Sequence, residues 1–237
     1  MKNRKHTAIR GITAFSLLLL LSGFSAVLSP AKAQNSTSCR YDDPASEFEH
    51  KVILLNHLTA EISIDTISKR VDGYAEFLYT TLNPSFDSVV LYAPGIIPVY
   101  ASVNDSMAVT RIAGSNIVIK SSNHHWQKQP GKLVIKYFSI SPAELHFVGW
   151  DDTTRRMRRQ IWAHRPFGWI PFQNDRLTID LKVKFSGTYQ VYSNGERIAA
   201  ASNSGNYKTW HYRMSKPHPF FSTALVIGHY SYRNFTT

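Results

Sequence analysis

The chain has 237 residues, of which 43% are hydrophobic and 13% aromatic. This composition is enough for a packed core and argues against wholesale disorder. The length fits one large β domain or at most two small domains.

The first 33 residues have the organisation of a secretory signal peptide. A basic beginning precedes an apolar run centred on residues 15–21, and Ala31-Lys32-Ala33 provides a cleavage site. The apolar run is short and is interrupted by Ser22 and Gly23, which disfavours a retained membrane anchor. We therefore expect a bacterial protein exported to the periplasm or the medium, with no stable membrane span after cleavage.

Cleavage also changes the charge argument. It removes five of the 27 basic residues and no acidic residue, which leaves 22 basic against 16 acidic residues and lowers the net charge from +11 to +6. An excess of this size does not indicate a nucleic-acid partner. Cys39 is the single cysteine, so no internal disulfide is expected. Residues 34–47 are polar and aperiodic, and we expect a flexible lead-in to one domain over residues 48–237.

Short apolar or alternating segments, each ended by turn residues, follow the lead-in. They predict strands over 52–67 (as two runs broken near Asn56 and His57), 74–82, 86–92, 99–103, 117–120, 132–140, 177–185, 189–193, 207–214 and 221–232. Asn194-Gly195 predicts a β-hairpin turn. No segment has a sustained helical period, so the pattern indicates an all-β fold of curved, multi-stranded antiparallel sheets or a β-sandwich.

The clearest alternation is near the middle of the chain. Leu177, Ile179, Leu181, Val183 and Phe185 alternate with polar residues, which predicts an antiparallel strand with one buried and one solvated face.

An aromatic and basic segment precedes this strand. It contains Trp162, His164 and Trp169, and Pro166 and Pro171 exclude a helix interior or a central strand. We therefore predict an ordered loop. Loops of this kind, held by a rigid sheet, often carry function.

Patterns for catalysis and metal binding are weak. There is no Gly-x-Ser-x-Gly, and Cys39 has no histidine near it, so no catalytic residue is predicted. The chain has ten histidines, a residue type that often binds metals. However, His211, His218 and His229 are scattered along the sequence, and the adjacent His124 and His125 would point in different directions on a strand. We expect no metal site in this chain.

Two further groups each have two interpretations. The arginines of residues 155–159 could bind phosphate or an acidic partner, but their proximity to Asp151 and Asp152 favours a solvated loop. Exposed tryptophans could stack on a ligand, although such residues more often fill a core or an interface. The tryptophans concerned are Trp150, Trp162, Trp169 and Trp210.

Several local patterns, taken in order, resemble one family. They are Gln160-Ile-Trp162, Trp169-Ile-Pro171, Asn174-Asp-Arg-Leu-Thr178, Val191-Tyr-Ser-Asn-Gly195, Lys208-Thr-Trp210, Lys216-Pro217 and Ser222-Thr-Ala-Leu-Val-Ile-Gly228. In this order they resemble the N-terminal β domain of the zinc aminopeptidases related to aminopeptidase N and leukotriene hydrolase, over about residues 48–232.

The resemblance implies a saddle-like β domain that lines one wall of a peptide-binding cleft and performs no chemistry. The family's Thr-Gln pair, whose glutamine lines the amino-terminal end of the substrate, corresponds to Ala163-His164 here. His164 is therefore the main substrate-binding candidate, and Trp162 and Trp169, which would pack the loop, are the other two. The partner implied is a catalytic domain or a separate chain that acts on peptide N-termini.

The family's Gly-Ala-Met-Glu-Asn and His-Glu-x-x-His motifs belong to the following catalytic domain, and neither occurs in these 237 residues. Zinc is therefore expected only in a catalytic domain absent from this chain, and the chain alone is expected to have no hydrolase activity. It would be a truncated or split product, or a stand-alone relative. Two alternatives are a stand-alone β-sandwich module that binds peptides or glycans, and a purely structural envelope protein.

Overall fold

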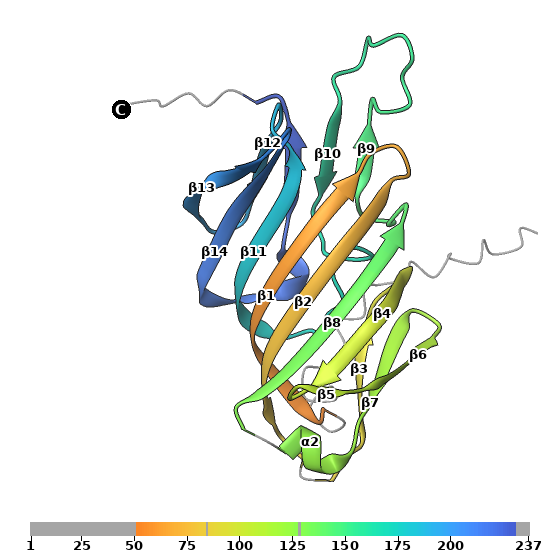
Figure 1. Ribbon diagram of the computed structural model, residues 1–237, viewed down its shortest axis with the longest axis vertical. Coiled ribbons are helices and arrows are strands. Elements are labelled where there is room, and N and C mark those ends of the chain that lie inside the picture. The colour runs from red at the N-terminus through yellow and green to blue at the C-terminus, as the bar shows by residue number, and fades with distance from the viewer. Residues whose placement is uncertain (1–50, 84, 128, 231–237) are drawn as a thin grey trace, which may run out of the picture. The chain divides into compact units, whose positions relative to one another are not determined.

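The structure is a computed structural model that describes residues 51–83, 85–127 and 129–230 (Figure 1). The predicted signal peptide, the lead-in and Cys39 lie outside the described residues. No helix among the described residues is long and apolar enough to cross a bilayer.

The described residues lie mostly in strands, which confirms the all-β prediction. The strands are β1 (Ile53–Asp65), β2 (Arg70–Thr81), β3 (Ser88–Tyr92), β4 (Ile96–Val103), β5 (Ser106–Met107), β6 (Val109–Ala113), β7 (Asn116–Lys120), β8 (Gly131–Ile140), β9 (His146–Val148), β10 (Gln160–Ala163), β11 (Arg176–Ser186), β12 (Gln190–Ser193), β13 (Glu196–Ser204), β14 (Tyr207–Pro219) and β15 (Leu225–Gly228). A short helix, α2 (Asn123–Gln127), and a 3-10 turn, η1 (Phe220–Ser222), interrupt them.

The described strands form three sheets. The largest has the order β13-β14-β11-β1-β2-β8-β4-β5, the second β12-β15-β10-β9, and the third β3-β7-β6. Figure 1 shows the large sheet running from β13 to β5, with β9 and β10 behind β1 and β2. One continuous hydrophobic core includes residues from all three sheets, such as Val183 of β11, Ile161 of β10 and Ile119 of β7.

The central strand β1 corrects one sequence prediction. The expected break near Asn56 is a register shift between Leu55 and His57 within one 13-residue strand. Pairing of β1 with β11 begins only at His57, and just before it the Asp175 carboxylate accepts a hydrogen bond from the Leu55 amide at 3.1 Å. Lys51 forms an ion pair with the same carboxylate, whose side chain is only 2% exposed. Asp175 therefore joins the beginning of β11 to the irregular part of β1.

The alternation predicted for residues 177–185 is confirmed in β11. Its apolar residues are buried, and the intervening side chains are exposed or partly exposed. The strand pairs antiparallel with β14 but parallel with β1, so the antiparallel expectation holds on one side only. Parallel pairing needs a long connection between the two strands, and here the chain from β2 to β10 provides it.

The hairpin predicted at Asn194-Gly195 is wrong. β12, before the turn, pairs with β15 in the second sheet, whereas β13, after it, pairs with β14 in the large sheet. Gly195 does have a positive φ of 88°, and a Cβ there would lie 2.2 Å from the Arg213 carbonyl oxygen. The prediction of a turn at Asn194-Gly195 was therefore correct. This turn leads the chain from one sheet into another instead of closing a hairpin.

Two tyrosine–glycine pairs lie between β2 and β8. Gly73 is opposite Tyr137, and Tyr79 is opposite Gly131. A Cβ at Gly73 would lie 2.1 Å from the Tyr137 ring, and one at Gly131 would lie 2.2 Å from the Tyr79 ring. Each ring occupies the space that a side chain on the partner strand would need, which explains the glycine in each pair.

The Asp175 junction gives a first prediction. Asp175→Ala leaves the Lys51 ammonium and the Leu55 amide without their carboxylate partner in a largely buried place. Loss of one member of a buried ion pair typically costs about 3–5 kcal/mol, and we expect a loss of about 3 kcal/mol in the free energy of unfolding, measured by urea denaturation. Asp151→Ala is the matched control, because the Asp151–Lys69 pair is exposed and should contribute under about 1 kcal/mol. Equal effects of the two substitutions would contradict the assignment.

Candidate functional site

The aromatic segment predicted as a loop begins with a strand. Residues 160–163 form β10, which pairs with β15 on one side and with the edge strand β9 on the other. Trp162 lies opposite His146 of β9, with the two ring centroids 4.2 Å apart. Trp162 is 37% exposed. The pair therefore forms a solvent-accessible aromatic surface on the second sheet.

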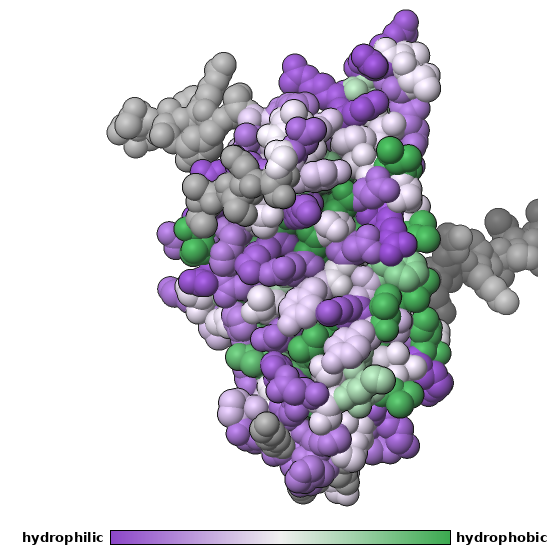
Figure 2. All heavy atoms as spheres, in the orientation of Figure 1, coloured by the Kyte–Doolittle hydropathy of each residue, from purple (hydrophilic) through white to green (hydrophobic). Residues whose placement is uncertain are grey.

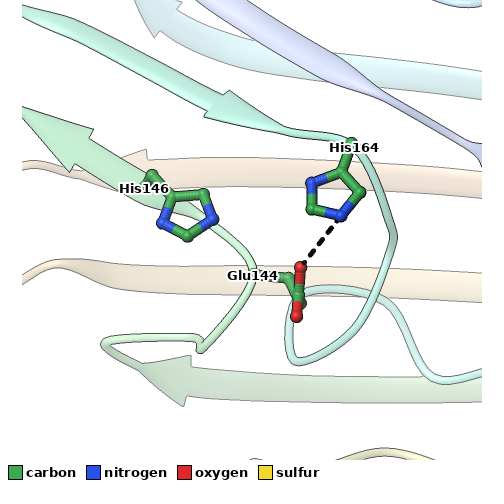
Figure 3. Close-up of side chains that lie close together, drawn as sticks. All are labelled: Glu144, His146 and His164. Atoms are coloured by element: carbon green, nitrogen blue, oxygen red, sulfur yellow. Dashed lines mark ion pairs between the residues drawn. The ribbon is translucent and has the colours of Figure 1, made fainter.

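His164, the main site residue predicted from the sequence, follows β10 directly. Its Nε2 atom lies 3.6 Å from Oε2 of Glu144, which precedes β9. Figure 3 shows these two side chains directed toward each other, with His146 beside them. The His164 side chain is 56% exposed and that of Glu144 is 28% exposed. The structure thus places His164 and Trp162 together at one accessible site.

Trp169 does not belong to this surface. Its side chain is fully buried in the core. The indole Nε1 donates a hydrogen bond to the Arg165 carbonyl at 2.6 Å, and the Trp169 carbonyl accepts one from the Tyr137 hydroxyl at 2.8 Å. Trp169 therefore packs the loop, as expected, and its buried ring offers no surface to a ligand.

The four tryptophans do not form one stacking surface. Trp210 is buried like Trp169, and Trp150 is partly buried against Phe185 and Tyr189. Of the tryptophans considered, Trp162 alone is among the exposed large hydrophobic residues described. The core interpretation therefore holds for most of this group.

Glu144 and His146 were not predicted as site residues from the sequence. The signal was present in the spacing, because Glu144 and His146 are two residues apart, as are Trp162 and His164. Residues two apart in extended chain lie on the same face, and the pairing of β9 with β10 brings the two faces together. A histidine judged within its own segment, however, gives no sign of a contact with another segment.

A second cluster of histidine and carboxylate lies on the large sheet. Asp180 of β11 accepts hydrogen bonds from His211 at 2.7 Å and from Arg213 at 2.8 Å, and His57 lies 3.6 Å away. Burial raises the pKa of Asp180, but the hydrogen bonds from Arg213 and His211 outweigh burial and hold that pKa below its usual value. The carboxylate is thus already neutralised by a permanent cation.

The remaining candidates are surface features. The arginines of residues 155–159 lie in the exposed connection between β9 and β10, where Asp152 accepts hydrogen bonds from Thr154 and from the Met157 amide. This agrees with a solvated, locally folded loop. His124 and His125 lie in α2 and not on a strand, which corrects the reason given for separating them.

The chain resembles solved structures in fold. The M1 zinc metallopeptidase from Deinococcus radiodurans matches with a TM-score of 0.58 and 14% identity, over 75% of this chain and 42% of that chain. The leukotriene A4 hydrolase of yeast matches with a TM-score of 0.61 and 15% identity, over 74% of this chain and 29% of that chain. A variant of the D. radiodurans protein was solved with a Tyr-Ser-Ala substrate.

No protein-family model matches the sequence, and no curated protein matches it. At such low identity, the likeness to the solved structures shows the fold. The fold resemblance expected from the local sequence patterns is therefore confirmed. The chain spans less than half the length of these structures, as one domain of such a protein would.

A second prediction concerns the support of the site loop. Gly73→Ala places a methyl group in the Tyr137 ring, so the ring must move and its hydrogen bond to the Trp169 carbonyl is lost. Overpacking of this kind typically costs about 1–3 kcal/mol, measurable by urea denaturation. Because the loop follows Trp162, the tryptophan fluorescence of the protein should also change. Gly187→Ala is the control, because the nearest atom to its Cβ would be 3.4 Å away. A Gly73→Ala protein as stable as this control would refute the argument.

Proposed function

We propose that this chain is the exported, non-catalytic β domain of a zinc metallo-aminopeptidase-like protein, and that it lines one wall of a peptide-binding cleft. The observation that carries the proposal is the likeness of its fold to the M1 zinc metallopeptidase and leukotriene A4 hydrolase structures over three-quarters of the chain. The ordered sequence patterns described above support the same relationship.

The face formed by β9 and β10 is the proposed wall. It presents Trp162 and His164 to solvent from a sheet that packs on the common core. His164 stands where the family resemblance implies a glutamine that lines the substrate's amino-terminal end. An imidazole, like a carboxamide, can exchange hydrogen bonds with a peptide's terminal groups, so the substitution preserves a polar contact at that position.

Exposed apolar side chains favour the proposal that a second domain packs against this chain. Val99 and Met107 are 68% and 77% exposed, and Val109 and Ile112 of β6 are exposed as well. Figure 2 shows hydrophobic residues gathered toward the β4 side of the large sheet, whereas hydrophilic residues dominate the rest of this face. Contiguous exposed apolar surface often marks an interaction site. A catalytic domain is the partner that the proposal implies.

The first test is activity of the isolated chain. The pure mature protein, loaded with Zn²⁺, is expected to release no nitroaniline from aminoacyl-nitroanilides, because it lacks the His-Glu-x-x-His motif that would hold a zinc-bound water. A homologous full-length enzyme serves as the positive control. Turnover that persists after repurification, and that a chelator abolishes, would refute a non-catalytic role.

The second test uses the codons that follow Thr237. An in-frame or shifted His-Glu-x-x-His there is expected, and its absence would argue against the cleft-wall proposal. With both parts expressed together, His164→Ala should lower kcat/KM for peptides about tenfold, the effect of losing one hydrogen bond to a charged group. His124→Ala, on the remote helix α2, should leave kcat/KM unchanged. Equal kinetics for the His164→Ala and wild-type enzymes would remove His164 from the cleft.

One observation favours the second candidate function, a stand-alone module that binds peptides or glycans. Trp162 and His146 form an exposed aromatic pair, and aromatic surfaces of this kind contribute large contact areas in recognition. Titration of the isolated chain with the Tyr-Ser-Ala tripeptide, followed by Trp162 fluorescence, separates the two functions. Saturable binding by the chain alone would favour the module over a domain whose cleft needs a second wall.

A further inference from the structure

Three side chains with metal-binding donor atoms converge on the face formed by β9 and β10. Glu144, His146 and His164 each contribute one donor atom, and these atoms lie within 4.8 Å of one another. We propose that they form a binding site for one divalent transition-metal ion, with Zn²⁺ and Cu²⁺ as the best-suited ions.

The donor set determines the class of ion. Two imidazoles and one carboxylate suit zinc, copper, nickel and iron, whereas calcium and magnesium prefer sites built from oxygen atoms alone. For a tetrahedral zinc ion with bonds of about 2.0–2.2 Å, the donors must lie about 3.3 Å apart. The donors must therefore approach one another by at most about 1.5 Å, which side-chain rotation of the exposed His164 and the partly exposed Glu144 allows.

The contact between His164 and Glu144 leaves room for an ion. The distance of 3.6 Å between His164 Nε2 and Glu144 Oε2 exceeds that of a normal hydrogen bond. Glu144 forms no hydrogen bond with any other residue that the structure describes. Its carboxylate therefore retains its acceptor capacity, and binding a cation breaks no existing hydrogen bond of this group.

The sheet holds the third ligand in place. His146 lies on β9, and its ring packs on Trp162 with an interplanar angle of 34°. Trp162 in turn lies on β10, two residues before His164, so strand pairing fixes the spacing between the two histidines. A ligand whose ring is held by packing loses less conformational freedom when it binds an ion.

The Asp180 cluster shows what a similar group looks like when it is not a metal site. Its two histidines and one carboxylate have the same composition, but Arg213 donates a hydrogen bond to the carboxylate. A guanidinium stays charged at any ordinary pH, so it occupies the carboxylate and repels a second cation. At the Glu144 cluster the adjacent Arg165 instead lies over the Phe167 ring. The two clusters therefore form a natural pair of test and control sites.

The experiment uses the mature chain without a histidine tag, in a Cys39→Ser background so that the free thiol cannot bind the metal. Isothermal titration with Zn²⁺ in a non-chelating buffer is expected to give one ion per chain. His164→Ala and Glu144→Gln should each weaken binding at least tenfold, since even the outer partners of metal ligands typically contribute about 10- to 100-fold. Both residues are accessible at the surface, so the variants should retain the wild-type melting temperature without metal.

A second readout places the ion beside Trp162. Cu²⁺ quenches the fluorescence of nearby indoles, so it should quench Trp162 in the wild type. Trp162→Phe should remove most of this signal while Zn²⁺ binding by titration persists. His211→Ala at the Asp180 cluster, and His124→Ala with His125→Ala in α2, should leave the Zn²⁺ affinity within twofold. Unchanged affinity in His164→Ala, or loss of binding in either control, would overturn the proposal.

Discussion

The site loop depends on the packing of Tyr137 against Gly73. The ring lies across the glycine of the neighbouring strand, and its hydroxyl donates a hydrogen bond to the carbonyl of Trp169. Burial raises the pKa of Tyr137 far above its usual value, so the hydroxyl remains a donor across the ordinary pH range. One side chain of the large sheet thus fixes the loop that follows His164.

The residues that stabilise the fold here are different from the exposed residues proposed to bind a ligand. Tyr137, Trp169 and Asp175 are buried and make their polar contacts with backbone groups or with a buried ion pair. Such groups are costly to disturb, because a buried polar atom that loses its partner is not rehydrated. Trp162 and His164 lie nearby but face solvent, where substitution costs little stability. The exposed face can therefore change its chemistry while the supporting contacts stay the same.

The sequence predicted what depends on local pattern. The burial of β11 follows from the alternation of Leu177 to Phe185, and the irregularity near Asn56 followed from a real interruption of the pattern. Pairing between distant segments was not predictable in the same way. The parallel contact of β1 with β11, and the division of β12 and β13 between two sheets, depend on which surfaces the whole chain buries together.

The same distinction explains the outcome at the site. His164 was found from a sequence resemblance, but its neighbours Glu144 and His146 were not, since they lie about twenty residues earlier in a segment with no motif of its own. Trp162 and Trp169 were both candidates, yet only Trp162 is exposed, because tryptophan spacing in a loop does not reveal which ring faces the core. Side-chain direction in irregular chain is set by tertiary packing, which no local period records.

The two clusters of histidine and carboxylate show how context determines the chemistry of the same residue types. Asp180 lies within the large sheet, and cross-strand neighbours on β14 supply both His211 and Arg213. Glu144 lies beside the edge strand β9, which has β10 as its single neighbour in the sheet. An interior strand receives partners from both sides, so its carboxylate is neutralised within the fold. At an edge, one side has no cross-strand neighbour, and a carboxylate there keeps the capacity to bind a cation from solution.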